Sequence, residues 1–458
     1  MLTKIPAEKI IAKALSYGAT FAEIFIEQSI TNSIVNDDKR LENIFSSTDA
    51  GVGIRVLQGT KTAYGSTNDF SRLSELAETV AKAAKKNFTH PASINFKETN
   101  PRLTIPIALH PTKVSMQQKI ETVLRAADVA WGAGSAICQV RVLYKDKVRQ
   151  IEIINSDGFI AKDEQVETVF YVQAVASKGD VLQTGYEPVG GGKGFEIFET
   201  KQPEKIAALA SKRAIQMLDA KPAKAGPMTV VLSSTAGGTM IHEAVGHGLE
   251  GDLAVQGLSV YNGRIGEKVA SSLITVYDDA TLVGHRGSFV FDDEGTPSQK
   301  TCLIEKGVLK GYLADRVTAL KSNAISTGNG RRQSYAHVPM VRMTNTIIAP
   351  GQDDPEKILQ ETKTGLFVTR MGGGQVNTVN GDFTFEVQEG YEIENGKIGQ
   401  LVRGASLIGN GPKILENIDR VGNDLGFSIG TCGKNSQEVP VESAQPTIRI
   451  PEIVVGGK

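Results

Sequence analysis

The stretch Val230–Asp252 reads V-V-L-S-S-T-A-G-G-T-M-I-H-E-A-V-G-H-G-L-E-G-D, and the rest of the chain is interpreted around it. A short apolar run at its start gives way to small residues and a glycine pair, and the residues that follow include His242, Glu243 and His247. An apolar run bounded by Ser, Thr and Gly is typical of a strand that ends in a turn. The sequence therefore predicts a strand, a turn and then a helix that carries these three polar side chains.

The three polar side chains are the groups that can hold zinc and deprotonate a water bound to it. The usual motif is H-E-x-x-H, with the histidines four positions apart, whereas His242 and His247 are five apart. On a regular α-helix five residues sweep about 500°, so these side chains would point roughly 140° apart and could not share one ion. Either the motif is accidental or the helix is locally widened. We predict a single π-type turn at Gly246, because such turns bring positions five apart onto one face and occur mostly at functional sites.

A third ligand is needed because catalytic zinc normally has three protein ligands and one open position. Glu250 and Asp252 follow the helix, but Glu250 would have to bend back past a turn. We expect it to be a solvated carboxylate or one that holds a histidine N–H. Cys432 lies in the polar loop S-I-G-T-C-G-K-N, where the glycines allow a close approach and Lys434 would favour the thiolate.

The remaining cysteines and histidines are weaker candidates. Cys138 and Cys302 are flanked by apolar residues, and we expect both to be small buried side chains. His285 in G-H-R-G and His337 in Y-A-H-V could ligate a metal, but a lone histidine is more often a hydrogen-bonded structural residue. The sequence leaves the roles of Glu250, His285 and His337 open.

The composition excludes several classes of protein. Fifty Lys and Arg residues face 51 Asp and Glu residues, a net charge of −1 that offers no surface for nucleic acid. There is no run of about 18 apolar residues and no apolar segment of the signal-peptide kind at the N-terminus, so neither a membrane span nor secretion is expected. Three widely separated cysteines suit a reducing compartment, and we place the protein in the cytoplasm.

The chain is too long for one ordinary core, and we divide it into residues 1–222 and 223–458 at the linker A-K-P-A-K-A-G-P-M. In the first part a helix, a group of strands and a second helix occur twice in succession. This order predicts an α+β class with a duplicated unit, in which an antiparallel sheet carries helices on one face. The predicted helices cover residues 6–17, 69–85, 111–131 and 203–218.

The second part is predicted to be mostly antiparallel β, with the histidine-bearing helix laid on it. Turn signals occur at E-K-G (305–307) and E-N-G (394–396), and only two further helices are expected, near residues 314–320 and 355–362. Gly372–Gly374 lack the Lys-Ser/Thr and the helix of a phosphate loop. They favour a tight hairpin or a flat floor for an extended peptide.

Four motifs together resemble the TldD/PmbA family over nearly the whole chain. They are H-E-A-V-G-H-G-L-E-G-D, D-D-E-G-T-P (292–297), M-G-G-G-Q-V-N (371–377) and G-T-C-G-K (430–434). The resemblance implies an N-terminal α+β domain, a β-rich C-terminal domain and metallopeptidase activity. TldD-type members use the H-E-x-x-x-H helix and a late cysteine as metal ligands, which PmbA-type partners lack. Since His242, Glu243, His247 and Cys432 all match, the chain is similar to the catalytic type.

The resemblance also implies the partners. It implies a homodimer or a heterodimer with a PmbA-like chain, and unfolded or short peptides as substrates, including peptide precursors and antitoxins. The family has also been described as a modulator of DNA gyrase, a role that the charge balance of this chain does not support directly.

On these grounds we expect one Zn²⁺ per chain, held by His242, His247 and Cys432, with Glu243 as the catalytic base of a peptidase that uses metal-activated water. An alternative is a non-catalytic subunit of such an assembly, in which the metal is structural or absent. A second alternative keeps the zinc but cleaves a non-peptide amide.

Overall fold

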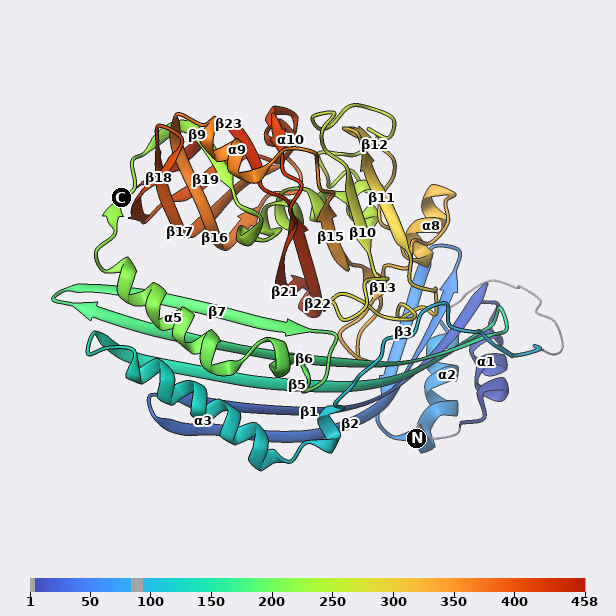
Figure 1. Cartoon of the computed structure of the whole chain (residues 1–458). Coiled ribbons are helices and arrows are strands. Elements are labelled where there is room, and N and C mark those ends of the chain that lie inside the picture. The colour runs from blue at the N-terminus through green and yellow to red at the C-terminus, as the bar shows by residue number, and fades with distance from the viewer. Residues whose placement is uncertain (1–4, 84–93, 458) are drawn as a thin grey trace.

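The computed structural model describes residues 5–83 and 94–457. Its N-terminal half is built on one long antiparallel sheet in the order β3-β2-β1-β5-β6-β7, with the short β4 pairing parallel to β6 (Figure 1). The strands are β1 (Phe21–Asp37), β2 (Arg40–Gln58), β3 (Lys61–Thr67), β4 (Lys97–Glu98), β5 (Ile137–Asn155), β6 (Phe159–Lys178) and β7 (Val181–Gly191).

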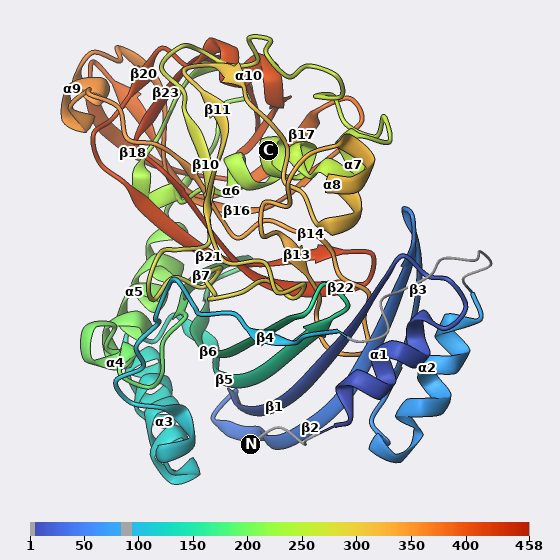
Figure 2. The ribbon, with the colours of Figure 1, turned by 90° about the vertical axis from the view of Figure 1, so that its right-hand side faces the viewer.

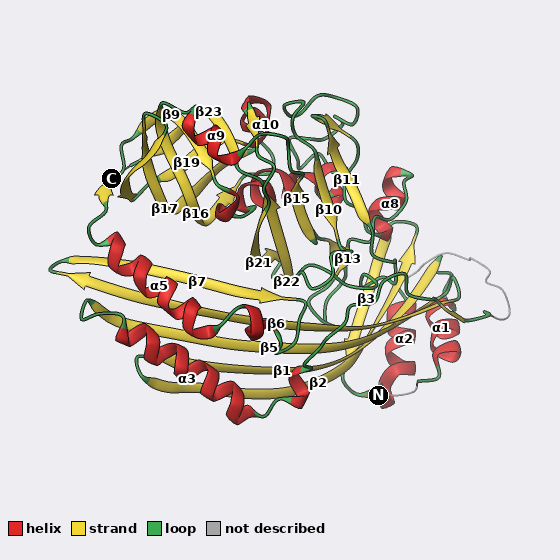
Figure 3. Ribbon diagram, in the orientation of Figure 1, coloured by secondary structure: helices red, strands yellow, loops and turns green. Residues whose placement is uncertain are grey.

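The helices of this half pack on one face of the sheet. Alternate residues of β1 point to opposite faces, and Ile24, Ile26 and Ile34 all lie in the cores beneath the helices. Phe25 points the other way and packs against Phe291 of the C-terminal half. The C-terminal half therefore sits against the other, concave side of the sheet (Figures 2 and 3), and of the helices α5 also reaches it, through the ion pair of Arg213 with Glu389. The helices are α1 (Ala7–Leu15), α2 (Leu73–Ala81), α3 (Met116–Gly132), α4 (Ile197–Thr200) and α5 (Pro203–Met217).

The predicted duplication is confirmed. The order helix, three strands, helix occurs as α1-β1-β2-β3-α2 and again as α3-β5-β6-β7-α5, and β1 and β5 lie side by side and antiparallel at the centre. The α+β class, the antiparallel sheet and the single helical face are therefore as expected from the sequence.

Two of the predicted helices differ from the structure at their N-terminal ends. Asp69 caps the 3₁₀ turn η1 (Phe70–Arg72) that precedes α2, and the last two residues of the predicted helix 69–85 lie outside the described residues. The helix predicted from residue 111 begins only at Met116, because Ser115 and Gln118 form a capping box there and residues 111–113 make a separate turn.

The C-terminal half contains two larger sheets. One has the order β12-β11-β10-β15-β22-β21, and in the other β16 pairs with both β9 and β17, so that β16, β9, β23, β19 and β17 close into a barrel. Most pairings are antiparallel, as predicted; β9–β16, β15–β22 and β8–β18 are parallel. The strands are β8 (Lys221–Pro222), β9 (Gly226–Leu232), β10 (Val276–Asp279), β11 (Lys300–Glu305), β12 (Val308–Leu309), β13 (Gly330–Arg331), β14 (Met340–Val341), β15 (Asn345–Ile348), β16 (Thr364–Val376), β17 (Asp382–Glu394), β18 (Lys397–Arg403), β19 (Ser406–Asn410), β20 (Arg420–Val421), β21 (Gly426–Lys434), β22 (Gln437–Gln445) and β23 (Ile448–Gly456).

The local predictions for this half are partly right. The turns at E-K-G and E-N-G join β11 to β12 and β17 to β18, and α8 (Arg316–Ser322) and α9 (Pro355–Gln360) lie close to the two expected helices. The expectation of only two further helices is wrong, because α10 (Gly411–Asn417) also forms, with Pro412 in its first turn. Gly372–Gly374 lie inside β16, where its register with β17 shifts, and not in a hairpin turn.

A network of buried charges joins the two halves. Arg55 of β2 lies 2.8 Å from Glu23 and 2.6 Å from Glu294, and Arg332 lies 2.6 Å from Glu23. All four side chains are at most 1% exposed. If the two halves moved apart, these buried charges would lose their partners, which is costly. The network therefore fixes how the C-terminal half sits on the sheet.

Among the described residues, no helix combines the length and the apolar character needed to cross a bilayer.

Candidate metal centre

The histidine-bearing helix starts directly after strand β9. The Ser233 side chain accepts a hydrogen bond from the Thr235 N–H in the 3₁₀ turn η3 (Ser234–Ala236), and Gly237 follows with φ +73°. That backbone conformation favours glycine, and it reverses the chain into α6 (Thr239–Ile241). The predicted order of strand, turn and helix is confirmed.

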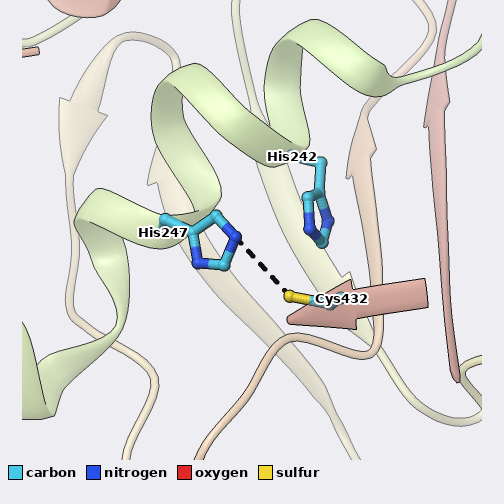
Figure 4. A group of neighbouring side chains, drawn as sticks. All are labelled: His242, His247 and Cys432. Carbon is cyan, nitrogen blue, oxygen red and sulfur yellow. Dashed lines mark hydrogen bonds between the residues drawn. The ribbon is translucent and has the colours of Figure 1, made fainter. Parts of the chain in front are cut away.

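The predicted π turn is also confirmed. Residues 242–246 form one π-helical turn (η4), in which the N–H of His247 donates to the carbonyl of His242, five residues back. A 3₁₀ turn η5 (His247–Leu249) and α7 (Gly251–Ala254) follow. The widened turn places both imidazoles on one side of the helix, with ring centroids 5.1 Å apart (Figure 4).

Gly246 is required for a different reason from the one we expected. Its φ of −56° is ordinary for a helix, so the turn makes no use of the conformational freedom of glycine. A Cβ at this position would lie 2.1 Å from Sδ of Met343, which is fully buried. The missing side chain lets the helix pack closely on the segment that leads into β15.

Gly246→Ala is therefore expected to lower the free energy of unfolding by about 1–3 kcal/mol, as overpacking in a filled core does. Thermal or denaturant unfolding measures the change. In a Met343→Val background, which removes the colliding sulfur, the same substitution should cost much less. An equal cost in both backgrounds would contradict the packing explanation.

The structure brings three of the sequence-predicted residues together. The ligand atoms of His242, His247 and Cys432 all lie within 4.8 Å of one another, and the sulfur is 3.5 Å from Nε2 of His247 (Figure 4). Bonds of ~2.1 Å to nitrogen and ~2.3 Å to sulfur at a tetrahedral angle put two donors ~3.5 Å apart. The spacing between His247 and the cysteine, which lies on β21, fits a shared zinc ion.

Two further observations test whether these residues fit a metal. Nδ1 of His242 is buried and has no hydrogen-bond partner within the part of the chain that is described. An unsatisfied buried polar group costs about 1–3 kcal/mol, so the cluster fits an occupant that accepts a nitrogen lone pair. The group holds these three donors and no fourth one among the described residues, which matches a site with an open position.

The electrostatics favour the ligating form of the cysteine. Burial alone would raise the pKa of the Cys432 thiol, but hydrogen bonds with His242 and His247 lower it to about 5. The thiolate is the form that binds metal.

Glu250 and Lys434 form a second layer behind His247. Oε2 of Glu250 lies 3.0 Å from Nδ1 of His247 and the carboxylate is fully buried. Burial would raise the pKa of Glu250, but Lys434 and His247 lower it to about 2, so the carboxylate accepts and the imidazole Nδ1–H donates. This contact leaves Nε2 free for the metal, and it is the outer role that we expected of Glu250.

The expected role of Lys434 needs correction. Its ammonium does not act on the thiol: it lies 3.1 Å from Glu250, 2.8 Å from Asp252 and 3.0 Å from the carbonyl of Val341. Lys434 and Cys432 are two positions apart on β21, while Glu250 and Asp252 follow His247. This ion cluster therefore fastens the strand that carries the sulfur to the helix that carries the imidazoles.

Glu243 lies at the edge of the cluster. Its Oε2 is 3.8 Å from Nε2 of His247, and its side chain is 27% exposed, more than the 14% of His247. It stands outside the three-donor group, which leaves its carboxylate available to a small molecule bound beside the cluster.

The other candidates lie elsewhere. His285 pairs with Glu442 at 3.1 Å, and His337 contacts the Ser334 hydroxyl at 2.9 Å, so both make the structural hydrogen bonds that we expected. The prediction that Cys138 is buried is wrong: it is exposed on β5, while Cys302 is partly buried. The register of β5 with β6 shifts between Ile137 and Gln139, so Cys138 lies at an irregularity while Ile137 and Val140 are buried, and the local sequence did not reveal this shift.

Sequence reasoning missed Arg342. This fully buried residue donates to the backbone carbonyls of Cys432 and Gln437 and so holds the β21–β22 hairpin in place. The signal was present, because an arginine inside the apolar run V-R-M must be compensated by acceptors.

A cleft of about 350 Å³ lies beside the segments that carry the cluster, although none of the three donors lines it. Thr239, three residues before His242, and Thr431, one residue before Cys432, line it together with Gly372 and Gly373 of β16. Beyond Arg370 the strand β16 pairs only with β17, and β21 is the last strand of its sheet. Two strand edges therefore border the cleft.

Known sequences support this description. The chain is 36% identical to the metalloprotease TldD homolog of Haemophilus influenzae over 95% of this chain and 93% of that protein. It is 28% identical to the zinc metalloprotease TldD homolog of Saccharolobus solfataricus over 98% and 99% of the two chains. Full-length likeness to proteins with these names supports a metallopeptidase.

Structure and family models agree. A Thermotoga maritima protein whose name links it to modulation of a DNA gyrase has a TM-score of 0.81 at 23% identity, covering 98% of both chains, a likeness that shows the fold. Models described as PmbA/TldA metallopeptidase domain 1, central domain and C-terminal domain match residues 22–86, 109–218 and 225–457. The chain therefore belongs to the TldD/PmbA family of metallopeptidases.

Proposed function

We propose that this protein is a zinc-dependent peptidase of the H-E-x-x-x-H type that hydrolyses unfolded or short peptides. The observation that carries the proposal is the convergence of His242, His247 and Cys432 to within 4.8 Å, with the Glu243 carboxylate beside them. One Zn²⁺ per chain would be held by the two imidazoles and the thiolate.

Zinc bound there supplies a Lewis acid that lowers the pKa of water toward about 7 and polarises the scissile carbonyl. The protein supplies the proton transfers. Glu243 takes the proton of the attacking water and then donates it to the departing amine. Glu250 keeps His247 in the tautomer whose Nε2 can ligate, because it accepts the Nδ1 proton.

The cleft supports an extended peptide as substrate. A peptide that adds as a strand along β16 or β21 would be held by its backbone, which explains how unrelated sequences could be accepted. Gly373 leaves room above β16, because a Cβ at this position would meet no other atom within 4 Å. Peptides N-methylated at alternate positions should bind markedly worse than their parents, and equal binding would exclude strand addition.

The rival function is a non-catalytic subunit whose metal is structural. A closed four-ligand site would favour that function, whereas three donors with a partly exposed carboxylate beside them favour hydrolysis. Cleavage of a non-peptide amide would use the same residues, and a substrate screen separates it from peptidase activity.

One experiment tests the function. The purified chain is expected to carry one zinc by mass spectrometry, to cleave unfolded peptides, and to lose cleavage with a chelator and regain it with zinc. Bound zinc without cleavage of any peptide, alone or with a PmbA-like partner, would favour the structural role.

We further propose that the protein works as a dimer, with itself or with a PmbA-like chain, in the cytoplasm. The three cysteines are all free, as expected in a reducing compartment. The mass of the purified chain in solution, alone and mixed with the partner, distinguishes the two assemblies.

Lys434→Met is expected to weaken zinc binding by about 10–100-fold, because loss of an outer partner usually costs that much. The substitution leaves Glu250 buried without its cation and loosens β21 from the helix. Competition with a chelator measures zinc affinity, and Lys413→Met on the exposed side of α10 is the matched control. An unchanged affinity would remove Lys434 from the metal centre.

A further inference from the structure

A second cavity lies between the N-terminal sheet and the β21–β22 hairpin. Its volume is about 210 Å³, far more than the ~10–15 Å³ that one water requires. Lys145 and Lys147 of β5 and Glu167 of β6 form part of its floor, and Arg331 and Pro440 of the C-terminal half form part of its wall.

Positive charge exceeds negative charge in this cavity. Arg149 pairs with Asp293 at 2.8 Å and with Glu27 at 3.1 Å, and Arg286 pairs with Glu167 at 2.7 Å. These three carboxylates are thus already engaged by two arginines. The other cations that line the cavity, apart from Arg332 in the network with Glu23, are Lys145, Lys147 and Arg331.

None of the three remaining cations has a carboxylate to itself among the described residues. Lys147 is 3.9 Å from Glu27, which already accepts from Arg149 and from the Tyr335 N–H at 2.8 Å. Lys145 is exposed at the mouth of the cavity and has no ion pair within 4.0 Å in the described part of the chain.

Arg331 is buried and satisfies its guanidinium with backbone groups. It donates to the carbonyls of Met343 at 2.6 Å and Pro440 at 2.8 Å. Burial lowers the pKa of Arg331 to about 10; Asp293 acts in the opposite direction, and the nearby guanidinium groups of Arg342 and Arg149 lower the pKa further. Its guanidinium is thus held by carbonyl groups and by no carboxylate within ion-pair distance in the described part of the chain.

The two other acids of the lining do not compensate. Asp292 accepts N–H groups from Glu294, Thr296 and Gly330, and burial raises its pKa well above the usual range. Glu438 is exposed on the hairpin.

We propose that this cavity binds a carboxylate of the peptide substrate, either the terminal α-carboxylate or an acidic side chain. The inference rests on the proposed peptidase function. Arg286 and Thr431 line both this cavity and the cleft beside the segments that carry the metal cluster. A peptide held in the cleft would therefore reach the cations, which would fix its position relative to the zinc.

The test uses one short peptide in four forms, with a free or an amidated C-terminus and with a glutamate or a glutamine in the sequence. Isothermal titration calorimetry measures binding to zinc-loaded Glu243→Gln protein, in which hydrolysis does not interfere. Removing the recognised carboxylate is expected to weaken binding roughly 10–100-fold, the range of hydrogen bonds to charged groups. The pair of peptides that differs identifies the source of the carboxylate.

Substitutions of the lysines that line the cavity test whether the cavity is the source of the preference for the anionic peptide. In a Lys147→Met background the preference for the anionic peptide should fall to within about twofold, and Lys145→Met, on the exposed rim, should reduce it in the same direction. Lys162→Met, which lies on the opposite face of β6 beside the exposed Glu98, is the control and should leave it unchanged.

Several results would overturn the proposal: equal affinity for all four peptides, no binding of any of them, or a preference that survives both lysine substitutions. Hydrolysis of the same peptides by the unsubstituted zinc protein is scored separately. Cleavage without a charge preference would reject the carboxylate site and keep the peptidase. A charge preference without cleavage would support the carboxylate site and reject the peptidase function.

Discussion

Glu243→Gln is expected to lower kcat for peptide hydrolysis by about 10²–10⁴-fold while the protein keeps its zinc, since proton transfer by a positioned base contributes rate enhancements of that size. The carboxylate lies 3.8 Å from Nε2 of His247 and outside the donor cluster. The amide keeps the shape of the side chain but cannot take a proton from water.

Initial rates on an unfolded peptide and zinc content by mass spectrometry measure the two halves of this prediction. Glu356→Gln, on the exposed first turn of α9, is the matched control and should change neither. If the Glu243→Gln protein cleaves peptides at the original rate, Glu243 is not the base. If that variant loses its zinc, the residue is a ligand.

Cys432→Ala is expected to reduce zinc affinity by more than the roughly 10–100-fold that loss of an outer partner costs, and to abolish hydrolysis as a result. The substitution removes the sulfur that stands 3.5 Å from Nε2 of His247 and leaves only two of the three donors. The small buried side chain can be shortened with little loss of packing, so the fold should persist.

Chelator competition, paired with a thermal unfolding curve, separates loss of metal from loss of structure. Cys302→Ala and Cys138→Ala remove the other two thiols, which lie outside the cluster, and both should retain zinc and activity. Wild-type affinity in the Cys432→Ala protein would mean that the ion is held without sulfur.

The candidate metal centre could be anticipated where the chemistry is encoded locally. A spacing of five between His242 and His247 is incompatible with a regular helix, and this conflict alone led to the π turn. The glycines around Cys432 indicated a segment that could bring a thiol close, although the predicted polar loop is in fact strand β21. The duplicated α+β unit was likewise visible, because its helices and strands repeat in order.

What could not be anticipated depends on residues that are distant in sequence. Lys434 was expected to act on Cys432, two positions before it on the same face of β21, but packing against the helix places its ammonium beside Glu250 and Asp252 instead. The contact of Arg55 with Glu294 spans 239 positions, and no local pattern predicts it. The basic cavity is formed in the same way, from β5, β6 and loops of the other half.

The position of the sulfur donor has a consequence for how the proposed zinc peptidase would mature. Cys432 follows His247 by 185 residues, so a nascent or truncated polypeptide that ends before β21 displays the complete histidine helix and still offers only two of the three proposed donors. Tight capture of zinc by the proposed ligand set would therefore wait until the last strands have joined their sheet. The ion would then enter only a chain that has already finished folding, and an incomplete chain would stay inactive.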